Sequence, residues 1–201
     1  MRILFVCTGN TCRSPMAEGM MRQIAKERGL DVEVRSAGVA ASDGSSMSRH
    51  AESVLKEQGI MDRIVSTSLH GELVEWADLI LALTEGHKRQ IVYTFPAAVD
   101  KTYTLKEYVE DNADVLAEKE ELQRLAAELE LDRALGKKPD DAARRRLNEL
   151  LHRLPVYDIS DPFGGSREDY NRAAAEIRAA LEKLADRLAS DRDHSGDTGW
   201  G

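Results

Sequence analysis

A cysteine and an arginine stand six positions apart near the start of the chain, with a serine directly after the arginine. They are Cys7, Arg13 and Ser14, in the run VCTGNTCRSP that fills residues 6–15. A cysteine attacks as its thiolate, which nearby positive potential stabilises. An arginine offers a planar fork of donors that matches two oxygens of a phosphate group, and Ser14 can either cap a following helix or donate to the Cys7 sulfur. These residue types at this spacing predict nucleophilic chemistry on a bound tetrahedral oxyanion.

The flanking segments predict that this run is a loop between a strand and a helix. Residues 3–6 are apolar and strand-like, and a helix signal follows at Pro15, which suits a first helical turn. Gly9 and Asn10 tolerate the left-handed backbone that a tightly curled loop needs. The loop N–H groups and the helix N-terminus are then expected to converge on one anion.

Two other kinds of site fit the run poorly. A nucleotide-binding loop would end in Gly-Lys-Ser/Thr or carry Gly-x-Gly-x-x-Gly, and neither pattern follows the first strand. A zinc site would need a second Cys or His pair at ligand spacing. The histidines are scattered, so we expect them at the surface or at helix ends rather than around a metal. They are His50, His70, His87, His152 and His194.

Cys12 is the second of the two cysteines in the chain, and two roles are open for it. It lies five residues after Cys7, so it can form a disulfide with an oxidised nucleophile and protect that sulfur from overoxidation. It can equally be a small buried residue that supports the loop. The distance between the two sulfurs decides between these roles.

Residues 5–18, FVCTGNTCRSPMAE, resemble the low-molecular-weight protein tyrosine phosphatase family and, more closely, its bacterial protein-arginine phosphatase branch. The similarity continues through four short segments and the C-terminal helix. These segments are VRSAG at 34–38, ADLILALT at 77–84, TLKEY at 104–108 and DPFGGS at 161–166. The resemblance covers residues 1–109 and 156–189.

The resemblance implies roles for three residues. In the family, the loop cysteine is the nucleophile, the loop arginine binds the phosphoryl group, and the aspartate of a late Asp-Pro pair is the general acid. By position these are Cys7, Arg13 and Asp161. Cys7 would attack phosphorus while Asp161 protonates the leaving atom, and water activated by Asp161 would then hydrolyse the phosphocysteine. Arg13 and the loop amides would stabilise the transferring group. No metal and no cofactor are expected.

The expected substrate is inferred from the residue type at Thr11. Tyrosine phosphatases of the family usually have a larger aliphatic side chain at the matching position, whereas the arginine phosphatases resemble this chain in having threonine. A shorter, hydroxylated side chain leaves room for a planar guanidinium and offers it an acceptor. We therefore expect hydrolysis of phosphoarginine side chains in proteins, with phosphotyrosine as the alternative. The expected substrate-binding residues are Thr8, Gly9, Asn10, Thr11, Cys12, Ser14 and Phe163.

Two interpretations from other classes are weaker. A catalytically idle scaffold could bind phosphoproteins through residues 110–155, but the joint presence of Cys7, Arg13 and Asp161 argues against idleness. Arsenate reductases share the fold and loop that the resemblance implies. The thioredoxin-coupled ones relay oxidation through further cysteines, and none follows Cys12.

Composition and charge favour a soluble cytoplasmic protein. The 201 residues carry 28 Lys and Arg against 36 Asp and Glu, a net charge of −8, which argues against nucleic acid as the main partner. We expect neither a transmembrane stretch nor a signal peptide, and therefore no membrane partner. A free thiolate favours a reducing compartment. Phosphorylated proteins are the expected partners, and the oligomeric state is left open.

Strand-like and helical runs alternate along the chain, which predicts an α/β fold: a doubly wound, four-stranded parallel sheet flanked by helices. Strands are expected at 2–6, 32–36, 78–83 and about 100–104, and helices at 15–28, 48–58, 70–76, 85–93 and 166–189. The first strand is expected to be central, with the cysteine loop at its C-terminal end.

Residues 110–155 depart from the family pattern. Leucines recur there at helical spacing on both sides of a turn at 136–140, so we expect an inserted helical hairpin. The hairpin is expected to pack on the domain or on itself, and a docking arm for partners or substrates is the alternative. The phosphatase domain is expected to span 1–189 with this insertion, followed by a disordered tail at 190–201.

Overall fold

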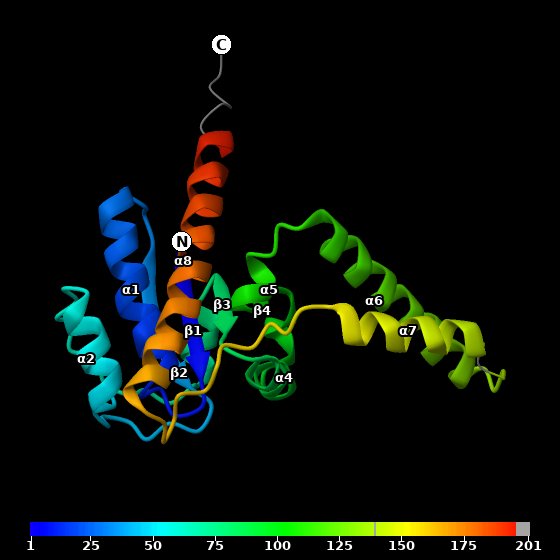
Figure 1. The fold of residues 1–201 in the computed structure, drawn as a ribbon, viewed down its shortest axis with the longest axis horizontal. Helices are drawn as coiled ribbons and strands as arrows, with labels where there is room; N and C mark the ends of the chain where they lie inside the picture. Colours follow the sequence, from blue (N-terminus) through cyan, green and yellow to red (C-terminus); the bar gives the residue numbers. More distant parts are fainter. Residues whose placement is uncertain (139, 196–201) are drawn as a thin grey trace, which may run out of the picture. The chain divides into compact units, whose positions relative to one another are not determined.

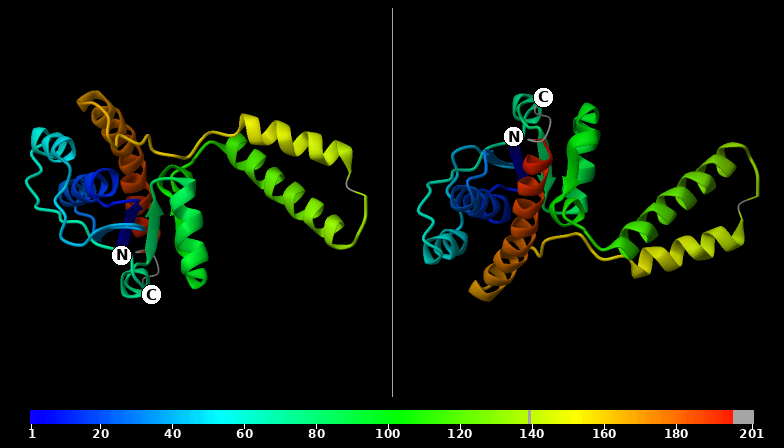
Figure 2. Two further views of the ribbon diagram at one scale, coloured as in Figure 1. Left: turned by 90° about the horizontal axis from the view of Figure 1, so that it is seen from below. Right: turned by 90° about the horizontal axis from the view of Figure 1, so that it is seen from above.

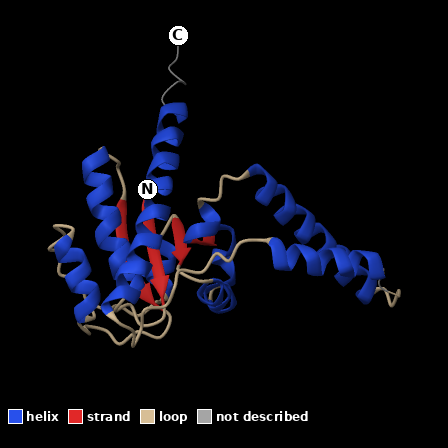
Figure 3. Ribbon diagram, viewed as in Figure 1, coloured by secondary structure: helices blue, strands red, loops and turns tan. Residues whose placement is uncertain are grey.

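The computed structural model describes residues 1–138 and 140–195, and these residues form two compact units. The first unit is built from Met1–Val109 together with the described chain from Tyr157 onward, and the second is Glu110–Val156. In the first unit, strands form the interior and helices flank them (Figure 3). The sheet and all the residues of the predicted site therefore belong to one unit.

The sheet has four parallel strands in the order β2-β1-β3-β4 (Figure 1). They are β1 (Arg2–Cys7), β2 (Glu33–Gly38), β3 (Leu79–Ala82) and β4 (Thr102–Thr104). Because β1 lies between β2 and β3, the loop that follows it starts near the middle of the edge formed by the carboxyl ends of the strands. Open parallel sheets bind their ligands at this edge. The predicted doubly wound fold is confirmed.

Helices cover both faces of this sheet because alternate residues of a strand point to opposite sides. Ile3 and Phe5 of β1 join one apolar cluster with α1, α2, α5 and α8, while Leu4 and Val6 join a second cluster with α3 and α4. All four side chains are fully buried, so β1 is a continuous apolar core strand. The helices are α1 (Arg13–Arg28), α2 (Arg49–Glu57), α3 (Gly71–Trp76), α4 (Glu85–Thr94), α5 (Leu105–Tyr108) and α8 (Arg167–Ser195).

Two boundaries differ from the sequence-based expectation. The last strand is shorter, because a 3-10 helix (Pro96–Lys101) occupies its expected first residues. Residues 190–195, which were predicted to begin a disordered tail, are helical instead, because α8 continues to Ser195. No glycine or proline interrupts residues 167–195, and Arg187 donates to the Tyr108 carbonyl oxygen at 2.5 Å, which ties the late part of the helix to α5. The other residues of that predicted tail, 196–201, lie outside the described residues.

The second unit contains two helices, α6 (Ala113–Ala134) and α7 (Asp141–Arg153), which lie side by side (Figure 2). Leu125 and Leu150 are buried between them, and the Arg146 guanidinium pairs with the Glu121 carboxylate at 2.7 Å. The predicted helical hairpin is thus present, and its helices pack on each other. Within residues 1–138 and 140–195, none of the helices combines the length and apolar character that a membrane crossing requires.

Candidate active site

The loop between β1 and α1 owes its tight curl to Asn10. Asn10 has a φ of 51°, and among the described residues it is the only one other than glycine with a positive φ. Asparagine tolerates this left-handed backbone better than most residues. The expectation is confirmed for Asn10, whereas Gly9 does not adopt a positive φ.

The end of β2 approaches the loop closely and holds its backbone. A Cβ atom at Gly38 would lie 2.4 Å from the Thr8 carbonyl oxygen and 2.9 Å from the Asn10 nitrogen. Only glycine permits this approach. Directly after Gly38, the Val39 N–H donates to the Cys7 carbonyl oxygen at 3.0 Å. The loop conformation is therefore fixed from outside as well as by its own residues.

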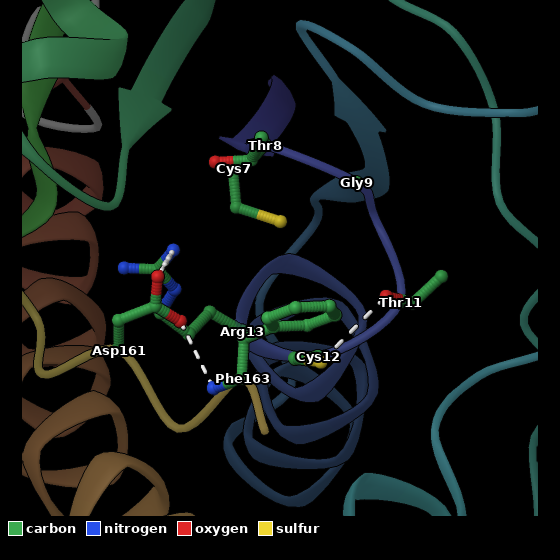
Figure 4. A pocket seen from close by; sticks show the side chains of 8 residues that line it. All are labelled: Cys7, Thr8, Gly9, Thr11, Cys12, Arg13, Asp161 and Phe163. Carbon is green, nitrogen blue, oxygen red and sulfur yellow. Dashed lines mark hydrogen bonds and ion pairs between the residues drawn. The ribbon is translucent and has the colours of Figure 1, made fainter. Parts of the chain in front are cut away.

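A cavity of about 260 Å³ opens inside this loop. Figure 4 shows the Cys7 sulfur, the Arg13 guanidinium and the Asp161 carboxylate around it. Eight of the ten predicted site residues line the cavity: Cys7, Thr8, Gly9, Thr11, Cys12, Arg13, Asp161 and Phe163. Across the described residues, no group of three or more His, Cys, Asp or Glu side chains is arranged to hold a metal ion.

Arg13 is buried at the base of the cavity and is held by the segment that precedes α8. Its side chain is 5% exposed, and its Nη2 lies 3.0 Å from Oδ2 of Asp161, whose side chain is 56% exposed. Its Nη1 donates to the Ile159 carbonyl oxygen at 3.3 Å. The Arg13 Nε is buried and has no hydrogen-bond partner among the described residues. One edge of the guanidinium is therefore available to a phosphoryl oxygen.

The Cys7 sulfur is held by a directed chain of hydrogen bonds behind the loop. The Thr67 N–H donates to Oδ1 of Asn10 at 2.8 Å, so the Asn10 amide nitrogen is the donor to the hydroxyls of Ser14 and Ser36, both at 2.8 Å. Since Ser14 accepts from Asn10, its single proton points either to the Cys7 sulfur, 3.0 Å away, or to the Ala37 carbonyl oxygen at 3.4 Å, and the sulfur is the nearer acceptor. Asn10 and Ser14 thus lie behind the loop rather than on the cavity wall. Ser36 thus braces the loop through Asn10.

The chain of hydrogen bonds ends at Glu18. The Ser36 hydroxyl donates to this carboxylate, which is itself buried on α1. Burial raises the pKa of Glu18 above its ordinary value, while the Ser36 hydrogen bond opposes that shift. Because the Ser36 hydroxyl donates its proton to Glu18, its oxygen is left to accept from the Asn10 amide nitrogen. Glu18 therefore helps to fix Asn10 as the donor to both serine hydroxyls.

Cys12 lies at the wall of the cavity as a buried, free thiol. Its sulfur lies 3.2 Å from the hydroxyl of Tyr170 on α8. Burial raises the pKa of that phenol, and the hydrogen bond to Cys12 adds to the shift. Cys12 therefore supports the loop in this state, and the disulfide with Cys7 stays a prediction.

His87 is the site residue that the sequence did not indicate. Its Nε2 lies 2.8 Å from the hydroxyl oxygen of Thr8, and only 7% of the residue is exposed. His87 lies in the first turn of α4, as expected for a histidine at a helix end, but the expected surface position is wrong, because α4 begins right after β3 and brings its first turn to the same sheet edge as the loop. The position of His87 just after a predicted strand could have indicated that it lies near the site. Burial lowers the pKa of His87 to about 4, and the charge of Arg13 contributes to the shift.

Because His87 stays neutral in the folded chain, we expect acid to destabilise the fold through it. Its folded pKa lies below the ordinary value of 6.5, so between about pH 6.5 and pH 4 the unfolded chain binds a proton that the folded chain does not. The free energy of unfolding should therefore fall by about 2 kcal/mol between pH 7 and pH 5 on this account. Urea unfolding of the unaltered chain and of a His87→Gln variant at both pH values checks this. Equal losses in the two proteins would contradict it.

With the geometry established, comparison with known proteins gives the family. A family described as "Low molecular weight phosphotyrosine protein phosphatase" matches residues 2–130. The chain belongs to this phosphatase family. The predicted resemblance is thereby confirmed.

Relatives within the family extend over nearly the whole chain. A "Protein-arginine-phosphatase" of Geobacillus stearothermophilus is 38% identical over 191 residues, which covers 95% of this chain and 98% of the relative. One of Bacillus subtilis (strain 168) is 38% identical over 192 residues, covering 96% and 99%. The solved structure of a YwlE arginine phosphatase mutant, with a phosphorylated serine in place of its active-site cysteine, is similar with a TM-score of 0.71 and 37% identity. It covers 96% of this chain and 99% of its own.

Proposed function

We propose that this chain is a protein-arginine phosphatase that hydrolyses phosphoarginine side chains of proteins through a phosphocysteine at Cys7. The observation that carries the choice of substrate is Thr11, whose side chain lies on the wall of the cavity that also holds Cys7 and Arg13. The similarity to two protein-arginine-phosphatases over more than nine-tenths of the chain supports the same substrate.

In the first step the Cys7 thiolate attacks phosphorus, so that a sulfur–phosphorus bond forms while the phosphorus–nitrogen bond breaks. The electron pair of the broken bond goes to the guanidine nitrogen, which takes a proton from Asp161. Arg13 and the loop N–H groups stabilise the charge on the phosphoryl oxygens during the transfer. Asp161 suits this role because it lines the cavity and is exposed enough to reach a leaving group.

In the second step water attacks the phosphocysteine and gives its proton to the Asp161 carboxylate, and the sulfur–phosphorus bond breaks to release phosphate. The returning thiolate is stabilised by the Ser14 hydroxyl at 3.0 Å. The phosphorylated serine in the YwlE mutant supports a covalent intermediate, because serine stands there where that enzyme has its cysteine. The proposal needs a free thiol, and Cys7 is free in this chain.

Recognition of the guanidinium would rest on three residues around the mouth of the cavity. The Thr11 hydroxyl and the carbonyl oxygen of the Asp161 carboxyl group offer acceptors, and the exposed ring of Phe163 can flank the planar group. A phenyl ring has no N–H groups to pair with Thr11. These features favour phosphoarginine over phosphotyrosine.

Replacing Thr11 with isoleucine is expected to lower kcat/KM on a phosphoarginine peptide and to raise it on the matching phosphotyrosine peptide. The ratio of the two should change by about a hundredfold, since one pocket contact carries roughly 1–3 kcal/mol of discrimination. Thr94→Ile, on the exposed end of α4, is the matched control and should leave the ratio unchanged. If the unaltered chain cleaves phosphotyrosine much faster than phosphoarginine, the protein is a tyrosine phosphatase instead.

The proposal assigns catalysis to the first unit and treats residues 110–155 as an insertion in a phosphatase domain that spans 1–189. All ten site residues belong to the first unit. We further infer that the protein works on phosphorylated proteins in a reducing cytoplasm, because the nucleophile must remain a thiol. The net charge of −8 supports protein rather than nucleic acid partners.

A further inference from the structure

Helix α6 carries one row of residues that faces its partner α7. Six of its residues follow one another at alternating spacings of three and four, and all are partly or fully buried. They are Val115, Glu118, Leu122, Leu125, Leu129 and Asp132. Such a repeat places the residues on one side of a helix, as in a coiled coil. This row accounts for the contact with α7.

A second row with the same type of repeat lies on the opposite side of α6. Seven residues follow one another at spacings of four, three, four, three, four and three, and all are exposed. They are Ala113, Ala117, Glu120, Arg124, Ala127, Leu131 and Ala134, and we call them the outer seam. Five of the seven are apolar, and the Leu131 side chain is 59% exposed. A helix with apolar residues on two sides normally buries both of them.

We propose that the outer seam pairs antiparallel with the outer seam of a second copy of this chain. The core of a heptad repeat has two kinds of position, called a and d. When two such seams pair antiparallel about a two-fold axis, each a residue of one helix faces a d residue of the other. With the axis level with position 122, Ala117 faces Ala127 of the second copy, and Ala113 faces Leu131. The small alanines allow the two helix axes to approach closely, and each leucine fills the space above an alanine.

The charged residues of the outer seam are what select a second copy as the occupant. In the same alignment Glu120 of each copy faces Arg124 of the other, so the two charged residues in the middle of the seam become two attractive ion pairs. The Arg124 side chain is 69% exposed, and its existing contact with Glu128, at 3.8 Å, is long and lies on the same helix. A parallel alignment would instead set Glu120 against Glu120 and Arg124 against Arg124. The charge pattern therefore favours the antiparallel dimer.

The test is the mass of the full chain in solution, measured by sedimentation equilibrium. We expect the mass to rise with concentration from 22.3 kDa toward twice that value. Glu120→Arg and Arg124→Glu should each weaken association at least about tenfold, because each creates two like-charged pairs across the dimer. An equimolar mixture of these two variants should associate again, since every pair in the mixed dimer is then Arg against Glu.

The matched control is Arg145→Glu, an exposed charge reversal on α7 that should leave the dimer unchanged. Turnover of a small phosphorylated substrate and the helical circular-dichroism signal should be the same for all these chains, which verifies that the first unit and the helical hairpin of each variant fold. A chain that stays monomeric at all concentrations would overturn the proposal. So would a dimer that is insensitive to the single reversals, or one that the mixture fails to restore.

Discussion

Replacing Cys7 with serine is expected to lower turnover of a phosphoarginine peptide by at least about a thousandfold. Serine keeps the shape of the side chain and the hydrogen bond to Ser14, but its hydroxyl is a far weaker nucleophile than a thiolate at neutral pH. A thousandfold loss corresponds to about 4 kcal/mol of transition-state stabilisation. The rates of the two proteins on one substrate, measured at equal concentration, check the prediction.

The same variant can also reveal the covalent step. If attack by serine still occurs slowly, the phosphoryl group should accumulate at position 7, where intact-protein mass spectrometry would detect it. The melting temperature should stay close to that of the unaltered chain, because the substitution conserves volume at a buried position. A variant that folds normally and keeps more than a tenth of the activity would show that Cys7 is not the nucleophile.

Replacing Asp161 with asparagine is expected to slow the reaction by about a hundredfold or more, since the amide can neither give the leaving group a proton nor take one from water. Side-by-side kcat values of the variant and the unaltered chain check this. The loss should shrink on a substrate whose leaving group needs no protonation, which distinguishes an acid from a residue that only holds Arg13.

Asp158 is the matched control, because it lies three residues earlier on the same segment but does not line the cavity. Its Oδ1 accepts from the Glu85 N–H at 2.7 Å, and the asparagine variant keeps an oxygen for that contact. Asp158→Asn should therefore retain most of the activity. Equal losses in the two variants would mean that Asp161 has no special role in proton transfer.

Sequence reasoning succeeded where the determining interactions are local. The apolar run of β1, the left-handed Asn10 and the short loop between strand and helix all follow from residues within about ten positions of one another. The apolar periodicity of the alternating strands and helices likewise indicates which side of each element is buried, so the sheet and its inner strand were predictable. The end of α8 was not, because its contact with α5 joins residues 79 positions apart.

The residues of the site also divide into those that local sequence indicates and those that only distant contacts bring into place. Cys7 and Arg13 could be named from motif and spacing, and Asp161 from the family resemblance, but the sequence did not indicate that Asn10 and Ser14 lie behind the loop. It also did not place His87 against Thr8, since that hydrogen bond depends on how α4 leaves the neighbouring strand.

The sequence by itself therefore determined the type of chemistry, because a thiol, a guanidinium and a curled anion-binding loop are encoded within one short segment. Only the tertiary structure decided which polar groups meet. The Asp161 carboxylate reaches Arg13 across 148 positions, and Glu18 orders the donors behind Cys7 through Ser36. It also left the outer seam of α6 exposed. Such contacts join residues that are distant in sequence, and only the packing of the elements can bring them together.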